Sequence, residues 1–309
     1  MRDILRRPFF RRAAPGGMMK VTVRAATDTG RVRDHNEDSY SAPRGKDSPP
    51  GVDALLVVAD GMGGHAAGEV ASRMTVEGIV QSLNDRGEES SKLRGNAFGA
   101  FLRRVLEEVN QKVWQAGQES DKRGMGTTCT LAAIRDDQLF LAHIGDSRAY
   151  LLRDGELHQV SKDHSWVEDA VDQGVITREQ ARIHPNRNVI TRAIGLELQT
   201  EIDTSVMALA DGDLLLLCSD GLNSMIPDEG IHRILTITGL EDVCRALIHA
   251  ANGQGGHDNI TVVVAKVCGR AKPTPRSSAE RPADQETQEI ANRPSLWKTM
   301  VGLIFRRRV

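Results

Sequence analysis

The chain has 309 residues, a formal net charge of −2 at pH 7, 39% hydrophobic residues and 4% aromatic residues. This composition is typical of a folded globular protein, and it argues against nucleic-acid binding because the chain is not basic and has few aromatic side chains for base stacking. The four cysteines are far apart and form no metal-binding or disulfide pattern, which favours a cytoplasmic protein with reduced thiols.

The N-terminal residues 1–19 are basic and lack the apolar core of a secretion signal. They predict a basic N-terminal arm, with Met18 or Met19 as an alternative start. From residue 20 to residue 268, apolar runs alternate with turn signals, which predicts one folded domain. No apolar run reaches the ~18 residues that a membrane span requires.

Within this domain, apolar runs bounded by turn residues predict buried strands at 54–60, 127–134, 138–146, 148–155, 213–221 and 259–267. Helical periodicity is found at 69–83, 97–117, 166–173 and 242–252. Asp154 and Gly155 stand between two strand-like runs and predict a hairpin with a type I′ turn. Hairpin-joined strands and grouped helices favour a layered α+β domain over a regular alternation of strands and helices.

Beyond the domain, residues 269–295 are polar and rich in proline, which predicts a disordered linker. Residues 296–309, LWKTMVGLIFRRRV, are too few to span a bilayer. This short apolar and basic segment either contacts an anionic membrane surface or a partner peripherally, or folds back onto the domain.

The stretch LLVVADGMGGHAAGEVAS, residues 55–72, contains a glycine-rich loop that fits the dinucleotide-binding pattern between a strand and a helix. That pattern requires a second strand ending in an acid roughly 20 residues later, and SLNDRGEESSKLRGNAFGAF offers none. Asp60 would also repel a pyrophosphate unless a cation stood between them. A nicotinamide oxidoreductase is therefore the weaker interpretation, and it would predict NAD(H) binding. No P-loop motif is present.

Acidic residues occur at the ends of the predicted strands. Asp60 and Asp220 each end an apolar run and are followed by glycine, Asp258 precedes the last strand, and Glu37 and Asp38 lie near the start of the domain. Any one of these acids could be a turn or capping residue. Four acidic segments brought to one place would repel one another strongly, and divalent cations would relieve this. Oxygen ligands without His or Cys clusters favour Mg²⁺ or Mn²⁺ over Zn²⁺.

The sequence resembles the metal-dependent protein phosphatases of the PPM, or type-2C, family in their compact bacterial form. The matching segments, in the order of the family, are RVRDHNEDSY, VVADGMGGHAAGEVAS, GMGTTCTLAAI, AHIGDSRAYLLRDGEL, SKDHSWVEDAVDQGVITREQARIHPNRNVITRAIG, LLLLCSDGL and GGHDNITVVV. The resemblance implies an α+β fold, a four-layer αββα sandwich in which two antiparallel β-sheets are flanked by antiparallel helices, with metals at one end.

The resemblance also implies two Mn²⁺ or Mg²⁺ ions. Asp60 would bridge them and Gly61 would bind one through its backbone carbonyl. Glu37 and Asp38 would lie beside the pair, one as a ligand and the other through water. The remaining ligands implied are Asp220 and Asp258 at the other ion and Asp146 at a third, weaker site.

In the mechanism that the resemblance implies, a metal-bridged hydroxide attacks phosphorus while Arg33 holds the substrate phosphate. His65 is a candidate general acid. Many family members, however, place a histidine directly after Asp-Gly, where this chain has Met62, so the alternative is a loop histidine near the metals. Residues 161–195 match the flap of the family, a mobile segment beside the cleft. Its arginines Arg182, Arg187 and Arg192 either meet an acidic phosphopeptide or are solvated.

The leading prediction is an enzyme, a cytoplasmic, monomeric serine/threonine protein phosphatase. It would act on phosphorylated proteins and oppose a bacterial Ser/Thr kinase. The alternative is a pseudophosphatase that binds phosphoproteins without turnover. Such a protein would be expected to lack one or more of Asp60, Asp220 and Asp258, and all three are present.

Overall fold

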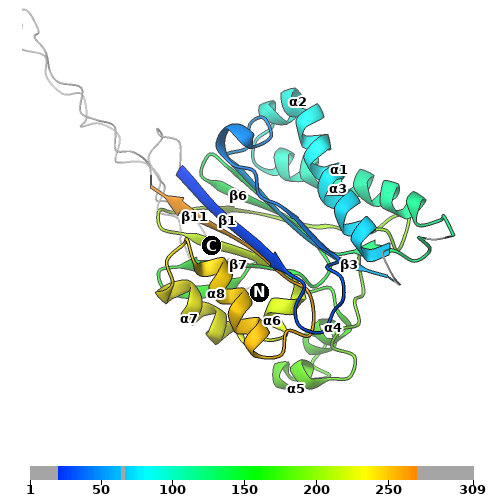
Figure 1. Ribbon diagram of the computed structural model, residues 1–309. Helices are drawn as coiled ribbons and strands as arrows, with labels where there is room; N and C mark the ends of the chain where they lie inside the picture. The colour runs from blue at the N-terminus through cyan, green and yellow to red at the C-terminus, as the bar shows by residue number, and fades with distance from the viewer. Residues whose placement is uncertain (1–19, 64–66, 121, 270–309) are drawn as a thin grey trace, which may run out of the picture. The chain divides into compact units, whose positions relative to one another are not determined.

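Two antiparallel β-sheets form the centre of the fold, and helices cover the outer face of each sheet (Figure 1). The computed structural model describes residues 20–63, 67–120 and 122–269. The first sheet contains, in spatial order, β1 (Lys20–Asp28), β11 (Ile260–Cys268), β10 (Leu214–Cys218), β7 (Arg148–Arg153) and β8 (Glu156–Gln159). The second contains β2 (Asp38–Ser41), β3 (Ala54–Met62), β5 (Cys129–Arg135), β6 (Gln138–Ile144) and β9 (Asp203–Ala208), and β4 (Gly126–Thr127) pairs with β3.

The helices divide between the two outer faces. On the second sheet lie α1 (Ala67–Asp85) and α3 (Asn96–Ala116), with α2 (Gly87–Lys92) between them in the chain. On the first sheet lie α6 (Asp220–Asn223), α7 (Asp228–Ile237) and α8 (Val243–Gly253). Figure 1 shows α1 and α3 in cyan on one side of the sheets, and α7 and α8 in yellow to orange on the other. Residues 161–195, which we call the flap, carry α4 (Trp166–Asp172) and α5 (Arg178–Ile183).

Three apolar layers result, because the central strands bury both faces. In β3, Leu55 and Val57 face α1 and α3, whereas Leu56 and Val58 face the other sheet. In β10 and β11 the same alternation divides side chains between the inter-sheet layer and the layer under α7 and α8. A strand with both faces buried has an almost continuously apolar sequence, which is why these runs could be recognised as strands.

The four-layer α+β sandwich expected from the resemblance is confirmed. The hairpin prediction is also confirmed, since Asp154 and Gly155 have φ values of 51° and 81° and join β7 to β8. The dinucleotide interpretation is wrong, because β3 pairs antiparallel with its neighbours β2, β4 and β5 and α1 leads to further helices rather than to a parallel strand. The sequence patterns predicted β8 only as the second strand of the hairpin, and they did not predict β1, β2, β9, α2, α5, α6 or α7.

Candidate metal centre and active site

The strand register places two acids face to face. Asp38 in β2 is the direct partner of Asp60 in β3. Alternation along β3 directs Asp60 to the inter-sheet side, at the end of the apolar layer formed by Leu56 and Val58. Like charges directly opposite each other destabilise a strand pair. The fold therefore forces a repulsive contact at this point.

The first sheet delivers two more acids to the same place. Helix α6 begins at Asp220, two residues after the end of β10, and Asp258 lies two residues before the start of β11. A Cβ atom at Gly221 would lie 2.1 Å from the carbonyl oxygen of Asn259, so only glycine allows the two backbones to approach this closely. Repulsion from Asp220 contributes to the raised pKa of Asp60, so acids of the two sheets lie close to each other.

Burial and mutual repulsion raise the pKa values of these carboxyl groups. Removal from water raises the pKa of Asp38 to about 7, and Asp220 and Asp258 add to the effect. Burial raises the pKa of Asp220 to about 6, with repulsion from Asp258 as the second cause. The pKa of Asp60 rises well above its usual range through burial and then through the surrounding carboxylates. A cation beside these carboxyl groups would favour their charged form and lower their pKa values again.

Two buried oxygen atoms of the cluster have no hydrogen-bond partner among the described residues: Oδ1 of Asp38 and Oδ1 of Asp220. The other oxygen of Asp38 accepts a hydrogen bond of 2.8 Å from the Ser219 hydroxyl. Buried carboxylate oxygens left unpaired are costly, and they are the ligands that Mg²⁺ and Mn²⁺ prefer. The donor set therefore fits a hard divalent cation. As the described residues are placed, no group of three or more His, Cys, Asp or Glu side chains could hold a metal ion.

The segment from Thr29 to Glu37 carries Arg33, and the Asn259 side chain bonds it at three points. The Asn259 amide donates to the carbonyl oxygens of Thr29 and His35, at 2.9 Å each. Its oxygen accepts from the Glu37 backbone N–H at 2.8 Å. Asn259 thus fixes the loop next to Asp258.

Arg33 lies against the cluster, because its Nη2 donates to Oδ2 of Asp258 at 2.7 Å. This bond to Asp258 raises the pKa of Arg33, and the guanidinium group remains half exposed. The arginine is thus at the mouth of the acidic cluster, with one N–H group paired and the rest of the fork accessible from solvent.

Gly61, Gly68 and Glu37 form a tight backbone contact beside Asp60. A Cβ atom at Gly61 would lie 2.2 Å from the Gly68 carbonyl oxygen and 2.6 Å from the Glu37 carbonyl oxygen. A Cβ atom at Gly68 would lie 3.0 Å from Oε1 of Glu37, so the Glu37 side chain packs against the start of α1. Burial raises the pKa of Glu37. His65 lies outside the described residues.

Asp146 is the fifth acid of the cluster. It is 8% exposed, and burial followed by repulsion from Asp220 raises its pKa well above the usual range. The turn before it is tied to the flap, because the Gly145 N–H donates to Nδ1 of His164 at 3.1 Å and the Gly145 carbonyl accepts from the His164 N–H at 2.8 Å. Nε2 of the same ring is 3.2 Å from Oδ2 of Asp203, and this hydrogen bond lowers the pKa of Asp203 to about 2.

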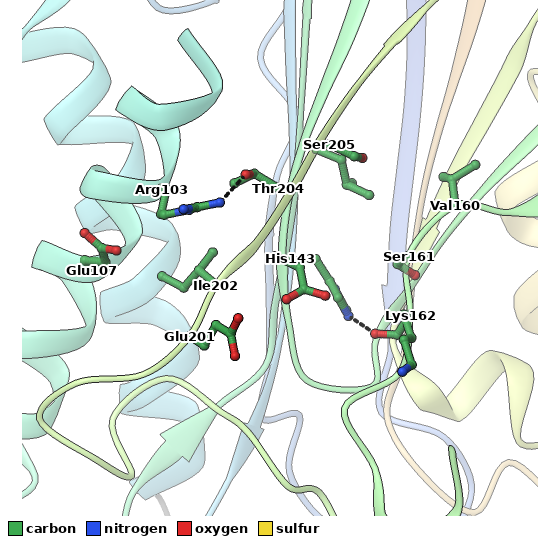
Figure 2. A pocket seen from close by; sticks show the side chains of 12 residues that line it. Arg103, Glu107, His143, Val160, Ser161, Lys162, Glu201, Ile202, Thr204 and Ser205 are labelled. Carbon is green, nitrogen blue, oxygen red and sulfur yellow. Dashed lines mark hydrogen bonds between the residues drawn. The ribbon is translucent and has the colours of Figure 1, made fainter. Parts of the chain in front are cut away.

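A cleft of about 360 Å³ opens beside the cluster, and Asp146 and Asp220 line it together with flap residues. A separate cavity of about 430 Å³ lies at the open edge of the sandwich. Figure 2 shows that cavity, where Arg103 of α3 reaches Thr204 of β9 and the His143 ring points to the Lys162 carbonyl. Burial lowers the pKa of His143 to about 4, so the ring is neutral. The acidic cluster does not line this cavity, and we place the reaction at the cleft.

Sequence reasoning missed the polar residues that hold the acids. Ser219 and Asn259 adjoin Asp220 and Asp258, and Thr128 accepts from the Asp60 N–H at 2.9 Å and contacts Ser147 at 2.7 Å. The available signal was their position next to predicted ligands within the quoted segments. Their role depends on contacts between segments far apart in the chain, which the sequence alone does not give.

Comparison with known proteins agrees with this geometry. The family model described as protein phosphatase 2C matches residues 31–259. The serine/threonine phosphatase stp of Listeria monocytogenes is 41% identical over 243 residues, which cover 78% of this chain and 93% of the relative. The solved serine/threonine phosphatase of S. agalactiae has a TM-score of 0.74 and 38% identity, covering 80% of this chain and all of that chain.

A further solved structure, the catalytic domain of the phosphatase PstP in complex with two manganese ions, has a TM-score of 0.69 and 38% identity, and it covers 82% of this chain and 100% of that chain. The fold and the acidic cluster, with these comparisons, define the class of the protein as a protein phosphatase. Within that class, the chain belongs to the protein phosphatase 2C family.

Proposed function

We propose that this protein is a metal-dependent serine/threonine phosphatase that hydrolyses phosphoserine and phosphothreonine in proteins. The observation that carries the proposal is the register that sets Asp38 opposite Asp60, with unpartnered oxygens on Asp38 and Asp220. Such an arrangement is unfavourable for the empty fold and favourable for binding divalent cations.

The ligands that we propose for two Mn²⁺ or Mg²⁺ ions are Glu37, Asp38, Asp60, the Gly61 carbonyl, Asp220 and Asp258, with Asp146 serving a third, weaker ion. When bound, the cations lower the pKa of water and neutralise charge on the phosphoryl group. The chain itself orients these ligands through Ser219, Thr128 and Asn259.

We propose that Arg33 binds the substrate phosphate. Its bond to Asp258 places the guanidinium group at the edge of the cluster, and its half-exposed fork offers paired N–H donors that match phosphate oxygens. His65 remains our candidate for the group that protonates the leaving alkoxide.

We further propose that the substrates include a bacterial Ser/Thr kinase and its targets, and that the protein works as a monomer in the cytoplasm. Its cysteines are free, and Cys129, Cys218 and Cys244 are buried, which agrees with a reducing compartment. No helix within the described ranges is long and apolar enough to cross a membrane. All of the linker 269–295 except residue 269 lies outside the described residues, as does the segment 296–309, and peripheral membrane contact through the latter stays a prediction.

The decisive experiment measures hydrolysis of p-nitrophenyl phosphate and of a phosphothreonine peptide with Mn²⁺ or with EDTA. Wild type would be compared with Asp220→Ala and with Asp47→Asn as a control, because Asp47 is an exposed acid in the connection between β2 and β3, at the end of this strand pair opposite to Asp38 and Asp60. We expect activity only with the metal, near-complete loss in Asp220→Ala, and wild-type activity in Asp47→Asn. Activity in EDTA, or activity retained by Asp220→Ala, would contradict the proposal.

A further inference from the structure

The cleft beside the acidic cluster is lined by both acidic and basic side chains. Asp146 and Asp220 line it at the proposed catalytic end, and Arg178, Arg182 and Arg187 of the flap line it as well. The segment that joins α6 to α7 also lines the cleft, through residues that include Ser224 and Met225. A substrate seated at the acidic cluster would therefore extend along flap arginines.

The remaining acids of the cleft already have partners. The guanidinium group of Arg148 holds the Asp163 carboxylate at 2.7 Å, Arg178 bonds both oxygens of Glu168 at 3.1 and 3.2 Å, and the Tyr150 hydroxyl contacts Asp228 at 3.1 Å. Asp146 and Asp220 belong to the proposed metal site. No lining carboxylate is thus available to neutralise a further cation.

Arg182 and Arg187 are the exceptions among the lining cations. Their guanidinium groups are exposed, and neither makes a hydrogen bond or ion pair with any residue in the described part of the chain. The exposed Glu179 lies on the same helix α5 and forms no ion pair with Arg182. Two unpaired positive charges at one wall of a cleft attract an anion.

We propose that this part of the cleft is a second anion subsite, in which Arg182 and Arg187 bind an oxyanion carried by the substrate peptide near its phosphorylated residue. A sphere of the cleft's volume, 360 Å³, is about 9 Å across, which equals about two to three residues of extended chain. The anion would therefore lie about two to three residues from the phosphoserine or phosphothreonine. This inference rests on the proposed function and specifies its substrate class.

The oxyanion has two possible sources with the same chemistry, the carboxylate of an acidic side chain or a second phosphate. A set of phosphothreonine peptides separates them: one with neutral residues, one with Glu two and three residues away on both sides, and one with a second phosphoserine at those positions. The measured quantity is kcat/KM for each peptide, divided by kcat/KM for the neutral peptide. Activity on p-nitrophenyl phosphate, which is too small to reach the flap, normalises for metal loading.

The variants are Arg182→Gln with Arg187→Gln, and the matched control Arg233→Gln. Arg233 is an exposed arginine of α7 that does not line the cleft and has no hydrogen bond or ion pair within the described ranges. Each exposed ion pair contributes a factor of about three to the ratio of kcat/KM for an anionic peptide to that for the neutral peptide. In the double variant this ratio is therefore expected to fall about tenfold for one or both anionic peptides. The control keeps the wild-type preference. High salt should reduce the wild-type preference as well.

A charge reversal, Arg182→Glu with Arg187→Glu, should turn the preference toward peptides with Lys at the same positions. The inference is overturned if wild type shows no preference for either anionic peptide, if the double variant retains the preference, or if Arg233→Gln loses it equally. Failure of the proposed function is a different result, because wild type would then hydrolyse none of the peptides in the presence of Mn²⁺.

Discussion

Raising the pH of the metal-free protein from 5 to 7.5 is expected to weaken its fold. Burial, with the neighbouring Asp220 and Asp258, gives Asp38 a pKa of about 7 in the folded state, whereas an unfolded chain has an Asp pKa of about 3.9. Between these values the folded state binds more protons than the unfolded state. The free energy of unfolding therefore falls as the pH rises through this window, and the stabilisation is complete only below about pH 4.

The size of this effect follows from the two pKa values. Each pH unit corresponds to about 1.4 kcal/mol, so the whole difference is about 4 kcal/mol for Asp38. About 2 to 3 kcal/mol of it falls between pH 5 and 7.5. A carboxyl group that is 9% exposed retains most of this penalty, because water screens it poorly.

The assay is urea unfolding in EDTA at pH 5 and at pH 7.5, for wild type and for Asp38→Asn. Asparagine keeps the shape of the side chain and cannot ionise. The free energy of unfolding of Asp38→Asn, relative to that of wild type, should therefore rise by about 2 to 3 kcal/mol from pH 5 to pH 7.5. Saturating Mn²⁺ should restore wild-type stability at pH 7.5 and should help Asp38→Asn less, since binding to the native state alone stabilises it. An equal difference between the two proteins at both pH values would refute the reasoning.

Other substitutions test the geometry. Gly221→Ala should unfold more easily and lose activity because its Cβ would lie 2.1 Å from a backbone oxygen, while Gly239→Ala, with nothing within 4 Å, should be tolerated in thermal melts and in the phosphatase assay. Arg33→Lys should lower kcat/KM about tenfold through loss of the paired N–H donors, and an unchanged value in steady-state kinetics would argue against phosphate binding there. His65→Gln should lose activity mainly on substrates with poor leaving groups, and an equal loss on p-nitrophenyl phosphate and a phosphopeptide would exclude the role of general acid.

The sequence predicted the central strands and Asp60, Asp220 and Asp258 for the same reason. A strand with both faces buried has a continuous apolar run, and an acid where such a run ends is conspicuous. The strands β2 and β9 could not be predicted in this way. Strand β2 has four residues, and most residues of β9 are only partly buried, so neither gives a long apolar run.

The pairing of the acids was also beyond sequence reasoning. Nothing in RVRDHNEDSY indicates that Asp38 lies opposite Asp60, because register is a property of two strands packed against a shared core. The three bonds of Asn259 join segments more than 220 residues apart in the chain. Such contacts became visible only in the structure.

The positions of Asp38 and Asp60 show how the fold creates its own requirement for metal. If the register of β2 moved by one residue, Asp38 would leave the inter-sheet side and the repulsion would vanish, but the proposed metal ligand would be lost as well. The apolar layers on both sides of β3 hold the register, so the strand cannot slip to relieve the charge. Apolar packing thus holds the carboxylates together against their mutual repulsion. When a cation is bound, packing and electrostatics both favour the same structure.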